Sequence, residues 1–195
     1  MHVRKSPTHL RSEPAAAQRR MQFTLGESNA KSIWSTSVYS YTGKGGGPGG
    51  GLADEKLRVG GWGDQYVALI QFDLPSRQTV HQALLKLAVM GDSPKNSRPT
   101  PMRLEIITQP WVWRAGDRLW WRDLPPGTPL MGMPTPGPPG SIYEINITEI
   151  YNDWANGRRP NFGLMLFPVL NDNNYSTFYS TRANPSQRPS LELTY

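Results

Sequence analysis

Residues 65–74 read QYVALIQFDL, and this stretch decides the fold class. Its even-numbered positions, from Tyr66 to Leu74, are all apolar, whereas its odd-numbered positions mix Val67 and Leu69 with polar residues. An alternation with a period of two is typical of a β-strand that places one face against a core. We therefore expect residues 65–74 to form one strand of a β-sandwich.

Short apolar runs between turns rich in glycine and proline predict about nine strands in all. The run 79–90 would suit a helix by propensity, but the alternation of its apolar residues favours a strand. Residues 124–140 hold seven prolines, which predicts a long extended surface loop. The other expected strands are residues 32–41, 56–60, 103–108, 143–147, 163–167, 177–180 and 191–195.

One short helix is predicted at about residues 148–156. Thr148 suits its N-cap and Gly157 its C-terminal stop, and apolar residues between them recur at the spacing of one helix face. A helical bundle is excluded, because the chain contains 19 glycines and 19 prolines. Together these patterns predict an all-β fold: an antiparallel β-sandwich of jelly-roll type with one short helix and an extended N-terminal arm.

The positive charge of the chain is concentrated at its N-terminus. The net charge is +6, and within the first 20 residues Glu13 is the single acidic residue against five basic ones: Arg4, Lys5, Arg11, Arg19 and Arg20. We therefore divide the chain into a basic arm, residues 1–30, and a sandwich domain, residues 31–195. The arm would either lie on an acidic partner surface or remain a solvated tail. It lacks the apolar stretch of a standard secretory signal peptide.

The residues that usually perform catalysis are sparse. There is no cysteine, which excludes disulfides, thiol nucleophiles and thiolate metal sites. The histidines are His2, His9 and His81, and no partner motif surrounds them. We expect no enzymatic activity, no cofactor and no metal. No apolar stretch approaches the roughly 20 residues of a membrane span, and no motif for specific nucleic-acid binding is present.

Tryptophan is the most informative residue type. Four of the seven tryptophans lie within residues 111–121, which read WVWRAGDRLWW. Exposed indoles beside arginine can stack on a sugar ring, and the same residues dominate protein interfaces. A third alternative is that they fill the core of a thin sandwich. The candidate binding residues are Trp62, Trp111, Trp113, Trp120, Trp121 and Arg118.

Several segments resemble a known family, the DNRLRE or disaggregatase-related domain, which is also classed as a carbohydrate-binding module. The resemblance covers residues 31–195 and implies a non-catalytic β-sandwich, often found on extracellular surfaces and in polysaccharide-active proteins. The segments are 57–60 (LRVG), 68–74 (ALIQFDL), 83–87 (ALLKL), 145–157 (INITEIYNDWANG), 160–164 (PNFGL) and 188–195 (RPSLELTY).

Two functions remain open. The first is a structural or decoration protein, attached through its arm and loops to protein subunits of a larger assembly such as a virion capsid or a surface lattice, copies of this chain included. The second is a carbohydrate-binding module that recognises a polysaccharide through exposed tryptophans. Either function would place the protein on a virion or an extracellular surface.

Overall fold

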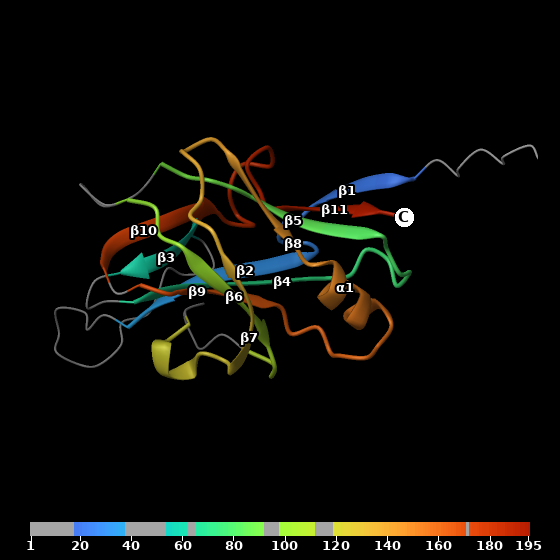
Figure 1. Cartoon of the computed structure of the whole chain (residues 1–195), viewed down its shortest axis with the longest axis horizontal. Coiled ribbons are helices and arrows are strands. Elements are labelled where there is room, and N and C mark those ends of the chain that lie inside the picture. Colours follow the sequence, from blue (N-terminus) through green and yellow to red (C-terminus); the bar gives the residue numbers. More distant parts are fainter. Residues whose placement is uncertain (1–17, 38–53, 62–64, 92–97, 112–118, 171) are drawn as a thin grey trace, which may run out of the picture.

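Two antiparallel β-sheets face each other in the computed structural model, as the sequence predicts (Figure 1). The structure describes residues 18–37, 54–61, 65–91, 98–111, 119–170 and 172–195. Among these residues there is one α-helix, and no helix is both long and apolar enough to cross a membrane. The predicted all-β sandwich with one short helix is therefore confirmed.

The smaller sheet has four strands and the larger one seven. The order in the small sheet is β1 (Arg20–Thr24), β11 (Ser190–Thr194), β5 (Gln82–Ala88) and β8 (Ile142–Asn146). The order in the large sheet is β10 (Asp172–Tyr179), β3 (Lys56–Gly61), β4 (Tyr66–Phe72), β9 (Leu164–Pro168), β6 (Met102–Ile107) and β7 (Gly127–Met133), with β2 (Ala30–Thr36) also paired to β4.

The main core fills the space between the two sheets. β4 contributes Ala68, Ile70 and Phe72 to it, and the small sheet answers with fully buried leucines such as Leu85 and Leu191. Each such side chain stabilises the fold by about 1.5–3 kcal/mol relative to its exposed state. The sandwich therefore depends on the even-numbered, apolar residues of β4, which point into the space between the sheets.

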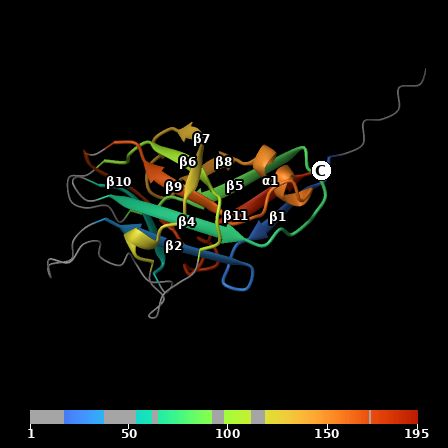
Figure 2. The ribbon, with the colours of Figure 1, turned by 90° about the horizontal axis from the view of Figure 1, so that it is seen from below.

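β4 is buried on its other face as well. Val67 and Leu69 are both fully buried, but they belong to a second apolar cluster on the outer side of the large sheet. In the view from below, β4 runs through the middle of the molecule with its sheet neighbour β2 beside it (Figure 2). The short 3-10 helix η1 (Trp121–Asp123) contributes Trp121 to the margin of the outer cluster. Val67 and Leu69, the apolar residues among the odd-numbered positions of residues 65–74, thus lie on a covered face, whereas Asp73 beyond the end of β4 is exposed.

Two strands were not predicted. β1 lies within residues 1–30, the segment assigned to the arm, and the small sheet already includes this segment from Arg20 onward. β7 lies within the segment expected to be a proline-rich loop. Among the described strands it is the last of its sheet and pairs with β6 alone, and an edge strand tolerates a proline such as Pro129.

The helix α1 (Thr148–Ala155) follows β8. Its N-cap is Ile147, so Thr148 is the first helical residue and the expected cap was wrong by one position. The Thr148 hydroxyl instead accepts a hydrogen bond from the Ala83 N–H (3.0 Å), which joins α1 to β5. Gly157 ends the helix as predicted, with φ +69°.

The backbone hydrogen bonds that follow α1 explain why Gly157 occupies this position. The Gly157 N–H donates to the Trp154 carbonyl (3.1 Å), and the Arg158 N–H donates to the Asp153 carbonyl (2.9 Å). This is the Schellman arrangement, which requires a left-handed residue at that position.

We expect Phe23→Ala to lower the free energy of unfolding by about 2 kcal/mol, because Phe23 is half-buried and packs against the main core from β1. Thr24→Ala, an exposed position in the same strand, is the matched control and should change it by less than about 0.5 kcal/mol. Urea denaturation measures both. Equal effects of the two variants would show that β1 contributes no core contact.

Two buried tyrosines predict a loss of stability in alkali. Burial raises the pKa of Tyr143 and of Tyr151 to about 12, from an ordinary value of 10.0. Between these pH values the unfolded chain loses protons that the folded chain keeps. The free energy of unfolding therefore falls as pH rises, by up to about 1.4 kcal/mol per pH unit for each group.

Tyr143→Phe should flatten this slope of unfolding free energy against pH, measured by urea denaturation from pH 9 to 12. The variant also loses the hydrogen bond that the Tyr143 hydroxyl donates to the Pro134 carbonyl, so the slope and not the absolute stability is compared. An unchanged slope would contradict the raised pKa of Tyr143.

Candidate binding surface

Part of the tryptophan-rich segment covers the outer face of the large sheet. Trp111 and Leu119 are buried there against Ile33, Val67 and Leu69, with Trp121 packed at the margin of the same cluster. A β-strand whose two faces are both apolar must be covered on both, because exposed Val and Leu side chains favour burial. The described ends of the tryptophan-rich segment therefore contribute to the packing of the fold, because Trp111 and Leu119 cover the outer face of β4.

Trp111 is a core residue and not an exposed binding residue. Only 3% of it is accessible, and its indole N–H donates to the Phe162 carbonyl at 2.7 Å. The Lys31 ammonium lies 4.3 Å from the ring centroid and donates to the Trp111 carbonyl at 3.3 Å. Burial lowers the pKa of Lys31. For Trp111, the burial of the ring favours the third alternative of the sequence analysis, in which a tryptophan fills the core.

Trp120 and Trp121 are half-buried, so each keeps part of its ring accessible. Trp121 packs on Phe167, with ring centroids 6.2 Å apart and planes inclined by 52°. The Arg122 guanidinium lies 5.2 Å from the centroid of Trp120. Neither of these adjacent indoles is fully buried, so neither is a core residue in the way that Trp111 is.

An oriented arginine extends this group. The Arg103 guanidinium lies 4.4 Å from the centroid of Phe167, and its Nε donates to Glu105 Oε1 at 2.5 Å. Glu105 is buried, whereas the Arg103 side chain is 39% exposed. A buried carboxylate fixes the guanidinium while its outer edge faces solvent. We name this group the aromatic–arginine surface; it consists of Trp120, Trp121, Phe167, Arg103 and Arg122.

The remaining tryptophans serve other purposes or cannot be placed. The indole N–H of Trp34 donates to Asp54 at 2.9 Å, and Trp154 is buried against Phe72. The candidates Trp62, Trp113 and Arg118 lie outside the described residues. Sequence reasoning missed Phe167 and Arg103, because only the pairing of β6 with β9 brings them beside Trp121.

Of the basic residues in the arm, some lie outside the described residues and some lie within them. Arg4, Lys5 and Arg11 lie outside the described part of the chain, whereas Arg19 and Arg20 are fixed at the small sheet. The Arg19 carbonyl accepts from the Tyr195 N–H at 2.9 Å, and Arg20 Nε lies 3.5 Å from Glu192 Oε1. Arg20 is thus already engaged by the domain itself.

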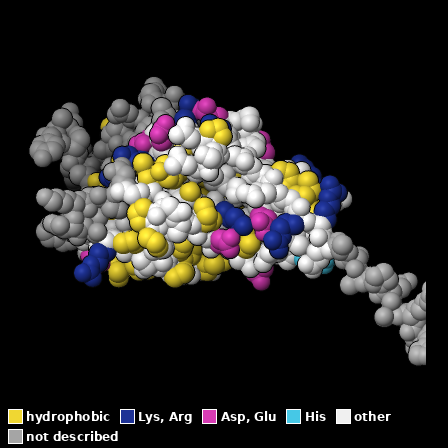
Figure 3. All heavy atoms as spheres, turned by 90° about the horizontal axis from the view of Figure 1, so that it is seen from above, with side chains coloured by type: hydrophobic (Ala, Val, Ile, Leu, Met, Phe, Trp, Pro, Cys, Tyr) yellow, Lys and Arg dark blue, Asp and Glu magenta, His cyan; other side chains and the backbone are white. Residues whose placement is uncertain are grey.

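Arg20 is the first member of a row of charges across the small sheet. Lys86 lies between Glu192 (2.9 Å) and Glu144 (3.0 Å), so β1, β11, β5 and β8 each contribute one charged side chain. Hydrogen bonds to Glu192 and then to Glu144 raise the pKa of Lys86. In the view from above, basic and acidic side chains adjoin one another beside an area of hydrophobic ones (Figure 3). The row is self-neutralising and therefore attracts neither sign of charge.

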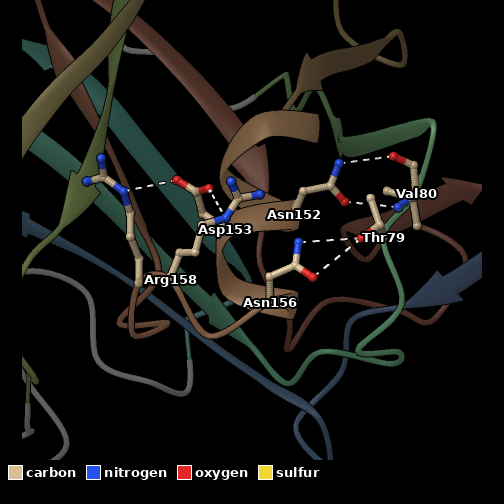
Figure 4. Close-up of polar contacts among 7 residues, drawn as sticks. Thr79, Val80, Asn152, Asp153, Asn156 and Arg158 are labelled. Atoms are coloured by element: carbon tan, nitrogen blue, oxygen red, sulfur yellow. Dashed lines mark hydrogen bonds and ion pairs between the residues drawn. The ribbon is translucent and has the colours of Figure 1, made fainter.

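Side chains at α1 hold the helix to residues 79–80, which precede β5. The Asn152 amide donates to the Val80 carbonyl (3.0 Å) and accepts from the Val80 N–H (2.9 Å), while Asn156 contacts Thr79 (Figure 4). Asp153 lies between two guanidinium groups, those of Arg158 and Arg159 (Figure 4). The residues that carry the family resemblance here hold the helix on the sheets.

His81, the one histidine that the structure describes, is exposed. It lines a cleft of about 500 Å³ with Asn146, Thr148 and Glu149. The Thr148 hydroxyl is used internally, because it donates to Asn146 at 2.6 Å. Within the described ranges, no group of three or more His, Asp or Glu side chains could hold a metal ion.

No protein-family model matches this chain, and no curated protein matches it either. The resemblance of residues 31–195 to the DNRLRE domain therefore stays a prediction.

We expect Trp111→Ala to lower the free energy of unfolding by about 3–5 kcal/mol, because it opens a cavity and removes the hydrogen bond to Phe162. Trp120→Ala, which is half-buried, should cost about 1 kcal/mol or less. Guanidinium denaturation followed by circular dichroism measures both. If Trp111→Ala proved as stable as Trp120→Ala, the outer cluster would not be a core.

Proposed function

We propose that this chain is a non-catalytic β-sandwich that attaches to the protein subunits of a larger assembly, copies of itself included. The observation that carries the proposal is the aromatic–arginine surface. It presents two half-buried indoles beside Arg103 and Arg122 on a face that the main core does not need. Tryptophan and arginine are the residues that most often dominate the energy of protein interfaces.

The preorganisation of this surface supports the proposal. Arg103 is held by Glu105 and Phe167, and Trp121 rests on the same phenyl ring. Side chains that are already fixed lose little conformational entropy when a partner binds. A partner that brings an acceptor for Arg103 and an apolar group for the indoles would therefore gain most of the available binding energy.

The basic segment supplies the second element of the proposal. Three of its basic residues, Arg4, Lys5 and Arg11, precede β1, and β1 is bound along β11. The segment is thus tied to the body at a defined place and adds electrostatic attraction to an acidic neighbour. An assembly of this kind would place the protein on a virion or an extracellular surface lattice.

Carbohydrate binding is the second candidate function. The half-buried rings of Trp120 and Trp121 could stack on sugars, and the resemblance to a carbohydrate-binding module favours it. The two functions make different demands on the same surface. A protein partner needs the arginines and the indoles together, whereas stacking on a neutral sugar needs the indoles alone.

Sedimentation velocity of the full chain at two salt concentrations tests the assembly proposal. We expect oligomers at low salt that shift toward the monomer in Trp120→Ala, in Arg122→Gln, and in a variant with glutamine at positions 4, 5 and 11. Arg98→Gln, an exposed position elsewhere, is the control of equal charge change and should assemble normally.

Two outcomes would contradict assembly through this surface. One is oligomerisation that all three variants retain. The other is a monomer at every concentration whose migration through gels of neutral polysaccharide is retarded even in high salt, a result that would establish the second candidate.

A further inference from the structure

The small sheet ends at β1, and the outer side of this strand is an open edge. Among the described strands, β1 pairs with β11 alone, and it lies at the margin of the molecule beside the C-terminus (Figure 1). An unpaired edge presents backbone N–H and C=O groups to which another strand can bind. We name the outer side of Arg20–Thr24 the β1 edge.

The hydrogen bonds at the two ends of β1 show which of its backbone groups face this edge. The Arg19 carbonyl accepts from the Tyr195 N–H (2.9 Å), and the Leu25 N–H donates to the Pro189 carbonyl (2.8 Å). In an antiparallel pair, residues that bind the partner strand alternate with residues that do not. The odd-numbered residues of β1 therefore bind β11, and the even-numbered residues direct their N–H and C=O groups outward.

Two apolar side chains remain half-buried at the β1 edge. They belong to Met21 and Phe23, and Phe23 packs against the main core. Alternate residues of a strand point to the same face of the sheet, so both side chains lie on the inner face. A further strand at this edge would cover the parts of both side chains that are still exposed, and burial of apolar surface is favourable.

Three other edge strands carry features that oppose the addition of a strand. β7 contains Pro129, which has no N–H to offer. β10 is covered, because the Tyr175 N–H donates to the Arg98 carbonyl at 2.8 Å. β8 has Glu144 at its centre, so two β8 strands paired about that residue would place like charges opposite each other.

The β1 edge lacks these obstacles. Its central residue, Gln22, is uncharged, and the strand contains no proline. Its single charged residue, Arg20, lies 3.5 Å from Glu192 on the neighbouring strand, so its charge is already compensated within the chain. A second β1 strand can therefore approach without bringing unpaired like charges together.

We infer that the β1 edge joins two copies of this chain into a dimer, in which one sheet runs continuously through both. Antiparallel pairing about Gln22 places Arg20 opposite Thr24 of the second copy, so the outward N–H and C=O groups of all three residues bind partners. The same register places Met21 beside Phe23 of the second copy, in the closer spacing of a pair without hydrogen bonds. A methionine sulfur against an aromatic ring is a favourable contact.

This dimer goes beyond assembly through the aromatic–arginine surface, because the β1 edge contains none of the residues of that surface. A two-fold joint of this kind closes at two copies. Further subunits would then attach to the dimer through the aromatic–arginine surface. Species larger than a dimer report on that surface, whereas the dimer itself reports on the β1 edge.

Sedimentation velocity over a range of protein concentrations tests the inference, in the full chain carrying Trp120→Ala and at about 0.5 M salt, where exposed charges are screened. We expect a dimer whose share rises with concentration. Gln22→Pro should raise its dissociation constant about tenfold or more, because each copy loses an outward N–H but no bond to β11. Gln22→Ala, which keeps the backbone N–H, is the matched control and should dimerise normally.

Single cysteines test the register, since the chain contains no cysteine of its own. Gln22→Cys would lie opposite its own copy with the two Cα atoms about 5.5 Å apart, a distance that a disulfide can bridge. Thr24→Cys, exposed in the same strand, would lie about 14 Å from its own copy. On mild oxidation, Gln22→Cys should form the covalent dimer at least about tenfold faster on a non-reducing gel.

Several outcomes would overturn the inference: a monomer at every concentration, an unchanged dissociation constant in folded Gln22→Pro, an equal loss of the dimer in Gln22→Ala, or equal cross-linking of the two cysteine variants. A dimer that the natural chain forms and Trp120→Ala alone abolishes would also overturn it, and would leave assembly through the aromatic–arginine surface standing. If circular dichroism shows that Gln22→Pro does not fold, the cysteine pair still decides the question.

Discussion

The structure depends on the burial of β4 on both of its faces. Ala68, Ile70 and Phe72 pack in the core between the two sheets. Val67 and Leu69 point to the outer face of the large sheet, where other side chains must bury them. Trp111 and Leu119, from the tryptophan-rich segment, make part of that cover. The half-buried ring of Trp121 lies at its margin, so the candidate surface adjoins a cluster that the packing of β4 requires.

The strength of the local pattern decided how much of the fold was predictable. β4, β5 and α1 were found because alternation, or helical spacing with a glycine stop, is visible in a window of ten residues. β1 and β7 were missed because edge strands carry weaker patterns, and their identity depends on partners far along the chain. β1 is identified by its pairing with β11, the C-terminal strand. The local sequence of residues 20–24 (RMQFT) gives no indication of that pairing.

The candidate sites were predictable in composition but not in geometry. Tryptophan count and spacing directed attention to residues 111–121, but nothing in that stretch separates buried Trp111 from half-buried Trp120. The difference arises from Val67 and Leu69, which lie about 40 residues earlier and set which ring is covered. The cleft at the C-terminal end of α1 had a weaker signal still, because its lining residues Arg77, Trp154 and Arg159 meet only after α1 packs on the end of β4.

The pairing of β1 with β11 also fixes how the domain responds to mechanical load. Arg20 lies opposite Thr194, and the Tyr195 N–H binds the Arg19 carbonyl, so residues 19 and 195 are neighbours. Hydrogen bonds in an antiparallel pair run perpendicular to the strands. A force that separates these two residues therefore breaks the bonds one after another, as in a zipper, and never loads them together in shear. Tension applied at this point would peel β1 away before the sandwich yields.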